Sequence, residues 1–309
     1  MREFGLIASV IVPIFLMMCL GYFIMRRKVI DRKGADQLNN IVFKFLLPVQ
    51  LFMNIFTSDL AQAMNWKLIG YSMGMVLLSY LALNLFVPRL FPDKRQNVPM
   101  VHAMFRSNYV IFGLVVVGGF YPNEVAVASV LAAFVIPVYN VLAVILLEKG
   151  SSLKKTVMGC IKNPLIIASV LGVVCNLLKM PVHPILLKFL QDVVKMTNPV
   201  ALLAVGMRFE FSSVKSNLRP LGTALAYRLL LLPVIATVGG ILLGFTNVEL
   251  MTILILFGSP CATACYTMSM GYDVDHTLAN QLVVFTTICC QISLFILLMI
   301  FSHTPFMVF

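Results

Sequence analysis

The chain contains an internal duplication, which appears when its first half is laid without gaps on its second half at a shift of 151 residues. The agreeing positions are Pro13 with Pro164, Gly21 with Gly172, Lys44 with Lys195, Pro48 with Pro199, Tyr121 with Tyr272 and Phe134 with Phe285. Each copy holds five apolar segments, and an odd number of membrane crossings places the second copy upside down relative to the first. The sequence therefore predicts two inverted repeats, at 1–149 and 150–309.

The composition is that of a polytopic membrane protein, because 60% of the 309 residues are hydrophobic and 11% are charged. Soluble domains are about 45–50% apolar and about 25% charged. Ten apolar stretches approach the ~20 residues needed to cross a bilayer, and they lie at 4–25, 37–57, 67–90, 98–120, 123–147, 161–179, 184–207, 217–244, 249–271 and 276–301. We therefore predict an all-α membrane protein with ten transmembrane helices and short loops, in contact with the lipid bilayer.

The net charge of +11 is distributed in a way that predicts topology, and no nucleic-acid partner is expected. Fifteen basic residues follow segments 1, 3, 5 and 7, namely Arg26, Arg27, Lys28, Arg32, Lys33, Arg89, Lys94, Arg95, Lys149, Lys154, Lys155, Lys162, Arg208, Lys215 and Arg219. The opposite side carries Arg2, Lys67 and Lys179. Because basic loops stay in the cytoplasm, we expect a multi-pass protein of the cell's inner (plasma) membrane, with the loop at 148–162 inside and both termini outside.

Neither the cysteines nor the histidines follow a metal-binding or catalytic spacing. Six of the seven Cys residues fall inside apolar segments, where small thiols usually pack, and these are Cys19, Cys175, Cys261, Cys265, Cys289 and Cys290. No HExxH motif occurs, the four His residues are dispersed, and Asp273 and Asp275 fall in a short loop after segment 9. We expect no metal, no cofactor and no enzymatic activity.

Five ionisable residues lie well inside the predicted segments, namely Lys44, Arg106, Asp192, Lys195 and Arg228, and Lys188 lies nearer a segment end. Such a group costs about 2.5–3.5 kcal/mol at the bilayer centre, so each needs a reason to be there. Lys44 lies near a helix end and can snorkel to the surface, while Lys195 and Asp192 are three residues apart and can neutralise each other. Arg106 and Arg228 have no acidic residue on their own helix, and they either bind an anionic substrate or brace the helices that do.

Segments 4 and 9 each contain a mid-membrane cluster of polar and helix-breaking residues. Segment 4 has Ser107-Asn108, segment 9 has Ser259-Pro260, and Asn108 falls on Ser259 under the shift of 151. Proline removes a helical hydrogen bond, and Ser and Asn offer the backbone other partners, so we predict a break in both segments. The alternative is a simple proline kink in segment 9 and an unbroken segment 4. A break lines a cavity or is buried in protein, and the free N–H groups of a new half-helix suit a carboxylate.

Several short motifs occur along the whole chain in a fixed order. They are Phe45-Leu46-Leu47-Pro48, Asn108 with Gly113-Leu114, Asn163-Pro164, Pro199-Val200-Ala201-Leu202-Leu203 with Gly206, Arg228-Leu229 with Pro233, and Ser259-Pro260 with Tyr272. Together they resemble the auxin efflux carrier family, which includes the plant PIN carriers and bacterial permeases proposed to move malate or malonate. The chain departs from this pattern at Ser107 and Val115, where PIN carriers have prolines around the first crossing, and it lacks their long central loop.

The resemblance implies ten helices in two inverted five-helix repeats, with helices 4 and 9 broken where they cross. It further implies that helices 1, 2, 6 and 7 form a scaffold and a homodimer surface. Helices 3–5 and 8–10 would form a moving, elevator-like transport domain.

These features predict a secondary transporter that exports or exchanges a small organic anion, such as a mono- or dicarboxylate, by alternating access. The expected substrate-binding residues are Arg106, Ser107, Asn108, Tyr109, Asn140, Ser259, Pro260, Cys261, Thr263 and Gln291, with Arg228, Lys195, Pro48 and Pro199 in support. The N–H groups after Pro260 and the amides of Asn140 and Gln291 would hold the carboxylate. No coupling ion is expected, because Asp192 is the sole intramembrane carboxylate. The alternatives are a sodium-coupled anion symporter of the bile-acid-symporter type and a non-transporting membrane receptor.

Overall fold

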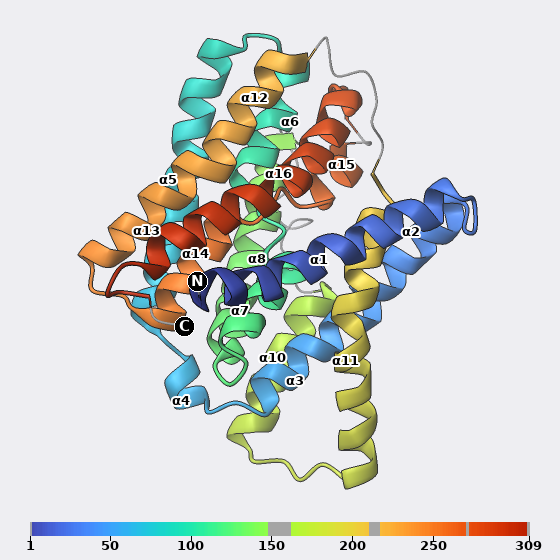
Figure 1. Ribbon diagram of the computed structural model, residues 1–309, viewed down its shortest axis with the longest axis vertical. Helices are drawn as coiled ribbons and strands as arrows, with labels where there is room; N and C mark the ends of the chain where they lie inside the picture. Colours follow the sequence, from blue (N-terminus) through green and yellow to red (C-terminus); the bar gives the residue numbers. More distant parts are fainter. Residues whose placement is uncertain (1, 148–161, 210–216, 270–271, 308–309) are drawn as a thin grey trace.

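The computed structural model describes residues 2–147, 162–209, 217–269 and 272–307, and its regular elements in these ranges are helices (Figure 1). The first-half elements, with η for π-helical turns, are α1 (Arg2–Arg26), α2 (Arg32–Ile41), η1 (Val42–Leu46), α3 (Leu47–Phe56), α4 (Leu60–Ala63), α5 (Trp66–Leu90), α6 (Lys94–Phe105), η2 (Tyr109–Gly113), α7 (Leu114–Phe120) and α8 (Val125–Leu147). The second-half elements are α10 (Pro164–Leu177), α11 (Pro184–Gly206), α12 (Leu218–Ala226), η4 (Tyr227–Leu231), α13 (Leu232–Leu242), α14 (Asn247–Gly258), α15 (Ala264–Ser269) and α16 (His276–Ser302). The predicted all-helical class is confirmed.

Six continuous helices within the described residues are long and apolar enough to cross a membrane. They are Phe4–Arg26, Arg32–Phe56, Trp66–Leu90, Val125–Leu147, Leu218–Leu242 and His276–Ser302. Shorter apolar helices lie at Tyr109–Phe120, Pro164–Leu177 and Asn247–Gly258. Ten crossings remain a prediction, because α10 has only 14 residues and α11 carries Lys188, Asp192 and Lys195. The expected cytoplasmic loop at 148–162 lies, except for Lys162, outside the described residues.

Short polar side chains begin several of these helices. The N-caps of α2, α5, α6, α10 and α16 are Asp31, Asn65, Asp93, Asn163 and Asp275. Each accepts a hydrogen bond from a backbone N–H in the first turn of its helix. Such a cap satisfies one of the four N–H groups that have no partner within the helix, which stabilises the helix by about 1 kcal/mol.

The two π-turns that interrupt long helices each come just before a proline. Pro48 is the second residue of α3, which follows η1, and Pro233 is the second residue of α13, which follows η4. A proline inside a helix has no N–H and its ring clashes with the carbonyl four residues earlier. The wider π-turn takes up this mismatch while the helix continues, so both spans stay unbroken.

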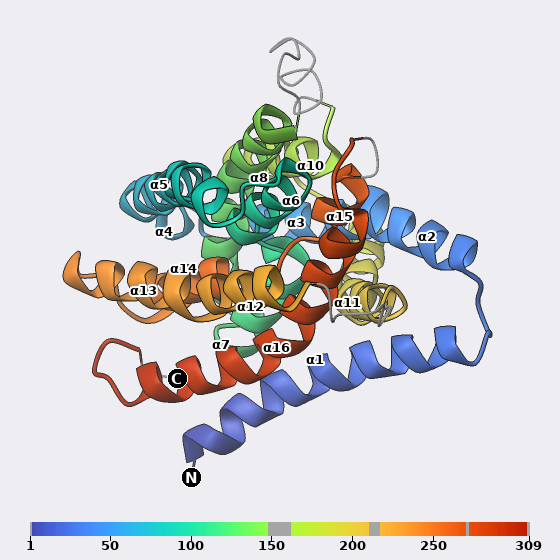
Figure 2. The same ribbon diagram turned by 90° about the horizontal axis from the view of Figure 1, so that it is seen from above.

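The connections between helices alternate between two sides of the bundle. In Figure 1 the α1–α2 connection lies at the right and the α5–α6 connection at the top, whereas the α3–α5 connection lies at the lower left, the α10–α11 connection at the bottom and the α13–α14 connection at the left. Figure 2 shows α1 running along the outside of the bundle, beside α16 and α11. The orientation of the loops and termini relative to a membrane stays a prediction.

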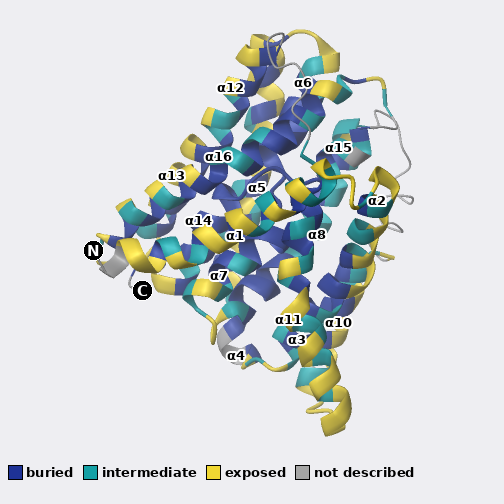
Figure 3. Cartoon of the chain, turned by 45° about the vertical axis from the view of Figure 1, so that its right-hand side comes forward, coloured by how far each residue is buried: buried dark blue, intermediate teal, exposed yellow. Residues whose placement is uncertain are grey.

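The core is centred on α14, in which every residue from Leu250 to Gly258 is buried (Figure 3). A helix that is apolar all round needs protein on every side, and α14 packs against α13, α7, α8 and α16. Large apolar side chains on outer helices are exposed instead, as at Leu78, Leu81 and Leu85 of α5. Such outward faces suit the hydrocarbon region of a bilayer.

Two helix crossings are unusually close, and both depend on glycine. A Cβ placed on Gly21 of α1 would overlap the carbonyl oxygen of Leu203 of α11. A Cβ placed on Gly172 of α10 would lie 3.0 Å from the carbonyl oxygen of Phe52 of α3. Small residues let membrane helices approach to backbone contact. The two contacts correspond under the shift of 151, since Gly21 maps to Gly172 and Phe52 maps to Leu203.

Candidate functional site

Segments 4 and 9 are interrupted where the sequence predicted a break in each. Helix α6 ends at Phe105 and the next helical turn begins at Tyr109, while α14 ends at Gly258 and α15 begins at Ala264. Arg106 and Ser259, which follow the two helix ends, have extended backbone angles. Each break therefore turns the chain out of its helix for a few residues.

The two breaks pair with each other through their backbones. Asn108 N donates to the carbonyl of Pro260 at 2.8 Å, and Ala262 N donates to the carbonyl of Arg106 at 3.2 Å. These bonds form an isolated antiparallel bridge between Ser107 and Cys261. Buried backbone groups need partners, and here each break supplies them to the other, which explains why segment 4 breaks without a proline at the break itself.

This pairing changes what the N–H groups after Pro260 can do. Cys261 N donates to Thr286 Oγ1 at 3.1 Å and Ala262 N donates to Arg106 O. The expectation that these two groups are free to bind a carboxylate is therefore wrong for the structure as it stands. The expectation failed because the sequence was interpreted one break at a time, and the backbone partner that the other break provides was missed.

Arg228 braces the two helices that end at the breaks. Its side chain is fully buried. The guanidinium donates to the carbonyls of Ser259 at 3.0 Å, Met104 at 3.3 Å and Leu256 at 3.4 Å. These carbonyls lie at the C-terminal ends of α14 and α6, where the helix dipole favours a positive charge. Of the two alternatives for Arg228, this geometry matches bracing.

Arg106 connects the first break to α8 and to α15. Its Nη2 donates to Asn140 Oδ1 at 2.7 Å, and its Nη1 approaches Met268 Sδ at 3.2 Å. Asn140, predicted to offer its amide to a substrate, thus uses its amide oxygen for Arg106. Tyr109 is also engaged, since its hydroxyl donates to Ala128 O at 3.2 Å.

Two polar atoms of the predicted set are buried without a hydrogen-bond partner. They are Ser107 Oγ and Gln291 Oε1. The Gln291 amide nitrogen donates to Thr287 O at 3.4 Å. A buried polar atom without a partner costs about 1–3 kcal/mol, and such atoms concentrate where ligands or waters bind.

Lys195 and Lys44 lie away from the breaks. Lys195 Nζ contacts Asp192 Oδ1 at 3.1 Å on the exposed surface of α11. This confirms that the two charges pair with each other. Lys44 is exposed in η1, as a snorkelling side chain would be, while Pro48 is buried and Pro199 is exposed.

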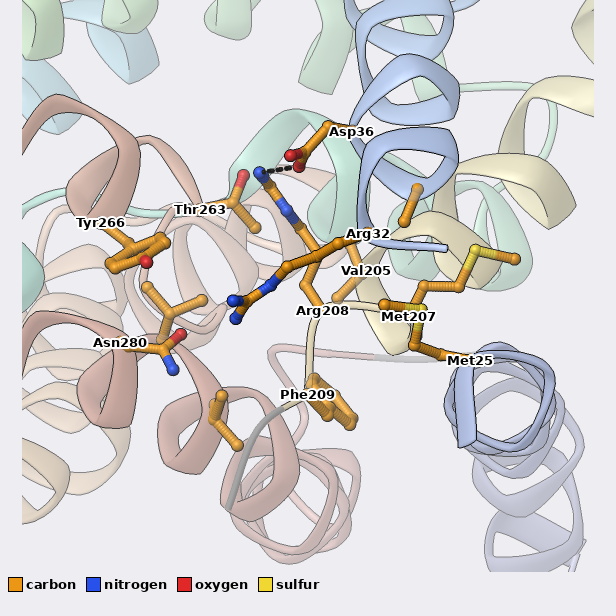
Figure 4. Close-up of a pocket in the computed structure, with 13 residues that line it drawn as sticks. Met25, Arg32, Asp36, Val205, Met207, Arg208, Phe209, Thr263, Tyr266 and Asn280 are labelled. Atoms are coloured by element: carbon orange, nitrogen blue, oxygen red, sulfur yellow. Dashed lines mark hydrogen bonds and ion pairs between the residues drawn. The ribbon is translucent and has the colours of Figure 1, made fainter. Parts of the chain in front are cut away.

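A cavity of about 260 Å³ lies beside the second break, between α1 and α2, the end of α11, and α15 and α16 (Figure 4). Its polar lining residues are Arg32, Asp36, Arg208, Thr263, Tyr266 and Asn280. Its apolar wall includes Met25, Val205, Met207 and Phe209. Of the predicted site residues, Thr263 lines this cavity. In Figure 4 the Arg208 guanidinium lies close to Thr263 and is joined to Asp36 by an ion pair.

Sequence reasoning missed Arg32, Asp36 and Arg208 as site residues, because the two arginines were explained as topology signals. Arg208 and Asp36 are 172 residues apart in the chain, yet their side chains meet at 2.7 Å. One signal was available: Asp36 is an acidic residue in the predominantly basic loop directly before the predicted segment 37–57.

A second cavity, of about 310 Å³, lies at the α3–α5, α7–α8 and α13–α14 connections. Three carboxylates line it, from Asp59, Glu124 and Glu249. Within the described residues, no group of three or more His, Cys, Asp or Glu side chains is arranged to hold a metal ion. The two cavities thus differ in charge, with basic groups in the first and acidic groups in the second.

Comparison with known proteins gives one clear relationship. The family model described as "Membrane transport protein", that of the auxin efflux carriers, matches residues 6–298. No curated protein matches the chain at a significant level.

Proposed function

Because this chain belongs to the auxin efflux carrier family of membrane transport proteins, we propose that it exports or exchanges a small organic anion by alternating access. The substrate class is mono- or dicarboxylates. The observation that carries this proposal is the cavity of about 260 Å³ in which Arg208 lies beside Thr263 of the second break. Guanidinium groups bind carboxylates with two parallel hydrogen bonds. A volume just below the ~300 Å³ at which drug-sized sites begin favours a small ligand.

The proposed architecture is a pair of inverted five-helix repeats whose broken helices cross at the bridge between Ser107 and Cys261. The matched crossings of Gly21 with Leu203 and of Gly172 with Phe52 support it. Thr197 Oγ1 also contacts Leu46 O at 3.4 Å, and these residues are 151 apart. A two-fold axis between the repeats brings equivalent residues together in this way.

In the proposed cycle, α1, α2–α3, α10 and α11 form a fixed scaffold that also carries a homodimer surface. Helices α5–α8 and α12–α16 move as one body. The Arg208 cavity lies between these two groups, with α2 and α11 on one wall and α15 and α16 on the other. Sliding of the second group would close this opening and carry Thr263 and the paired breaks toward the opposite side.

The two cavities support movement of the anion from the side of the basic loops to the opposite side. Basic groups in the first cavity attract an anion, and Asp59, Glu124 and Glu249 in the second repel it after release. If the basic loops are cytoplasmic and the termini outside, this direction is efflux. A negative cell interior then adds about 2.3 kcal/mol per charge per 100 mV, so no coupling ion is required.

Reconstitution in liposomes tests the function. In proteoliposomes loaded with radiolabelled malonate, we expect efflux in sodium-free buffer to accelerate when a potassium gradient with valinomycin makes the interior negative. An Asp192→Asn variant should behave alike, because Asp192 is paired with Lys195 on the surface of α11. Efflux that stays at the level of empty liposomes until sodium is added would support the sodium-coupled alternative, and no efflux of any tested carboxylate would overturn the proposal.

Asn108 provides a test of the breaks as a substrate site. Its backbone N–H makes the bond to Pro260, whereas its side chain does not cap the following helix. Asn108→Ala should therefore keep the bridge and weaken carboxylate affinity by roughly 5–150-fold, the equivalent of about 1–3 kcal/mol for a lost buried hydrogen bond. The measurement is the half-saturating malonate concentration in counterflow. An unchanged value at equal protein amount would remove Asn108 from the site.

A further inference from the structure

Arg208 already forms an ion pair with a carboxylate of the chain itself, that of Asp36. Its Nη2 lies 2.7 Å from Asp36 Oδ1, and both residues line the cavity of about 260 Å³ (Figure 4). The Arg208 side chain is 22% exposed and the Asp36 side chain is 56% exposed. The cation is therefore held in the cavity wall, whereas the carboxylate reaches it from the open side.

The contact between the two side chains is weaker than the best that Arg208 can make. It consists of a single hydrogen bond from Nη2 to Oδ1, whereas a guanidinium can offer two parallel N–H groups to one carboxylate. Exposed ion pairs of this kind contribute little to stability. Asp36 also loses little on release, because more than half of its side chain already contacts solvent.

We propose that Asp36 is an internal carboxylate that holds Arg208 in the empty cavity and is replaced there by the carboxylate of the substrate. This inference rests on the proposed function and assigns Asp36 the role of an internal competitor for the anion-binding Arg208. A planar carboxylate with two oxygens gains both N–H groups of the fork and displaces Asp36. Chloride offers no such geometry and competes poorly with Asp36. Because Asp36 must leave before any anion binds, it lowers the affinity of Arg208 for every anion by the same factor.

Charge-removing variants of the full-length protein separate this role from a merely structural one. Counterflow of radiolabelled malonate is measured in proteoliposomes, with chloride as the competitor. Asp36→Asn should lower the half-saturating malonate concentration about two- to fivefold, as expected for release of an exposed ion pair, and should make chloride a better inhibitor. Arg208→Gln should raise the half-saturating malonate concentration about tenfold. Asp36→Ser serves as a second variant if Asp36→Asn is poorly folded.

The matched control is Asp31→Asn, which removes the same charge from the same helix. Asp31 caps α2 by accepting a bond from Gly34 N at 2.7 Å, and asparagine caps equally well. This control should leave malonate and chloride behaviour unchanged. A raised malonate concentration in the Asp36 variants would mean that Asp36 positions Arg208, and values equal to wild type would mean that it is uninvolved; either result overturns the inference alone. If the wild-type protein transports no tested carboxylate, the proposed function is overturned as well.

Discussion

Arg228→Met is expected to abolish malonate transport and to lower the unfolding temperature of the purified protein. The fully buried guanidinium satisfies carbonyls of Ser259, Met104 and Leu256. Methionine fills similar space but offers no donor, so these carbonyls at the ends of α14 and α6 lose their bonds. Each buried carbonyl left without a donor costs about 1–3 kcal/mol, so the loss is a large part of the typical stability of about 5–15 kcal/mol.

Two further variants make this prediction specific to the bracing geometry. Arg228→Lys keeps the charge but presents one compact ammonium group, which satisfies fewer of the three carbonyls. We therefore expect an unfolding temperature between those of wild type and Arg228→Met, and slow transport. Arg89→Met is the matched control, because Arg89 is exposed and bonds the Leu85 carbonyl of its own helix. It should resemble wild type in thermal unfolding followed by fluorescence-detected size exclusion. Wild-type stability and transport in Arg228→Met would show that Arg228 braces nothing.

The positions of the helices could be predicted because they depend on local chemistry. The third predicted segment, 67–90, agrees with α5 at Trp66–Leu90, since its length is set by the bilayer and its start by the capping side chain of Asn65. The break after Phe105 was likewise visible as Ser107-Asn108, two residues that compete for backbone hydrogen bonds. Each of these features can be read within a window of a few residues.

The chemistry of the site depended on contacts that no such window contains. The N–H groups after Pro260 were expected to bind substrate, but Ala262 N donates to the carbonyl of Arg106 at the other break. Arg208 was explained by topology alone, although its side chain pairs with Asp36 of α2, a helix far away in the sequence. A pattern of residue types specifies what a group can bond, whereas only the tertiary arrangement decides which partner reaches it first.

Gly206→Ala is the second substitution for which we expect a large effect, because it adds a Cβ where the backbones of α1 and α11 are in contact. A Cβ at Gly206 of α11 would overlap the carbonyl oxygen of Met18 of α1, one turn from the close contact between Gly21 and Leu203. A backbone carbonyl cannot rotate away as a side chain can, so α1 must move off α11. Overpacking costs about 1–3 kcal/mol, and here Met25 of α1 and Val205 of α11 line the Arg208 cavity, so transport should fall together with the unfolding temperature. The control is Gly74→Ala in α5, where a Cβ meets nothing within 4 Å and alanine should stabilise the helix by roughly 0.5–1 kcal/mol. If Gly206→Ala unfolds at or above the temperature of Gly74→Ala, then α1 and α11 are not held at backbone contact.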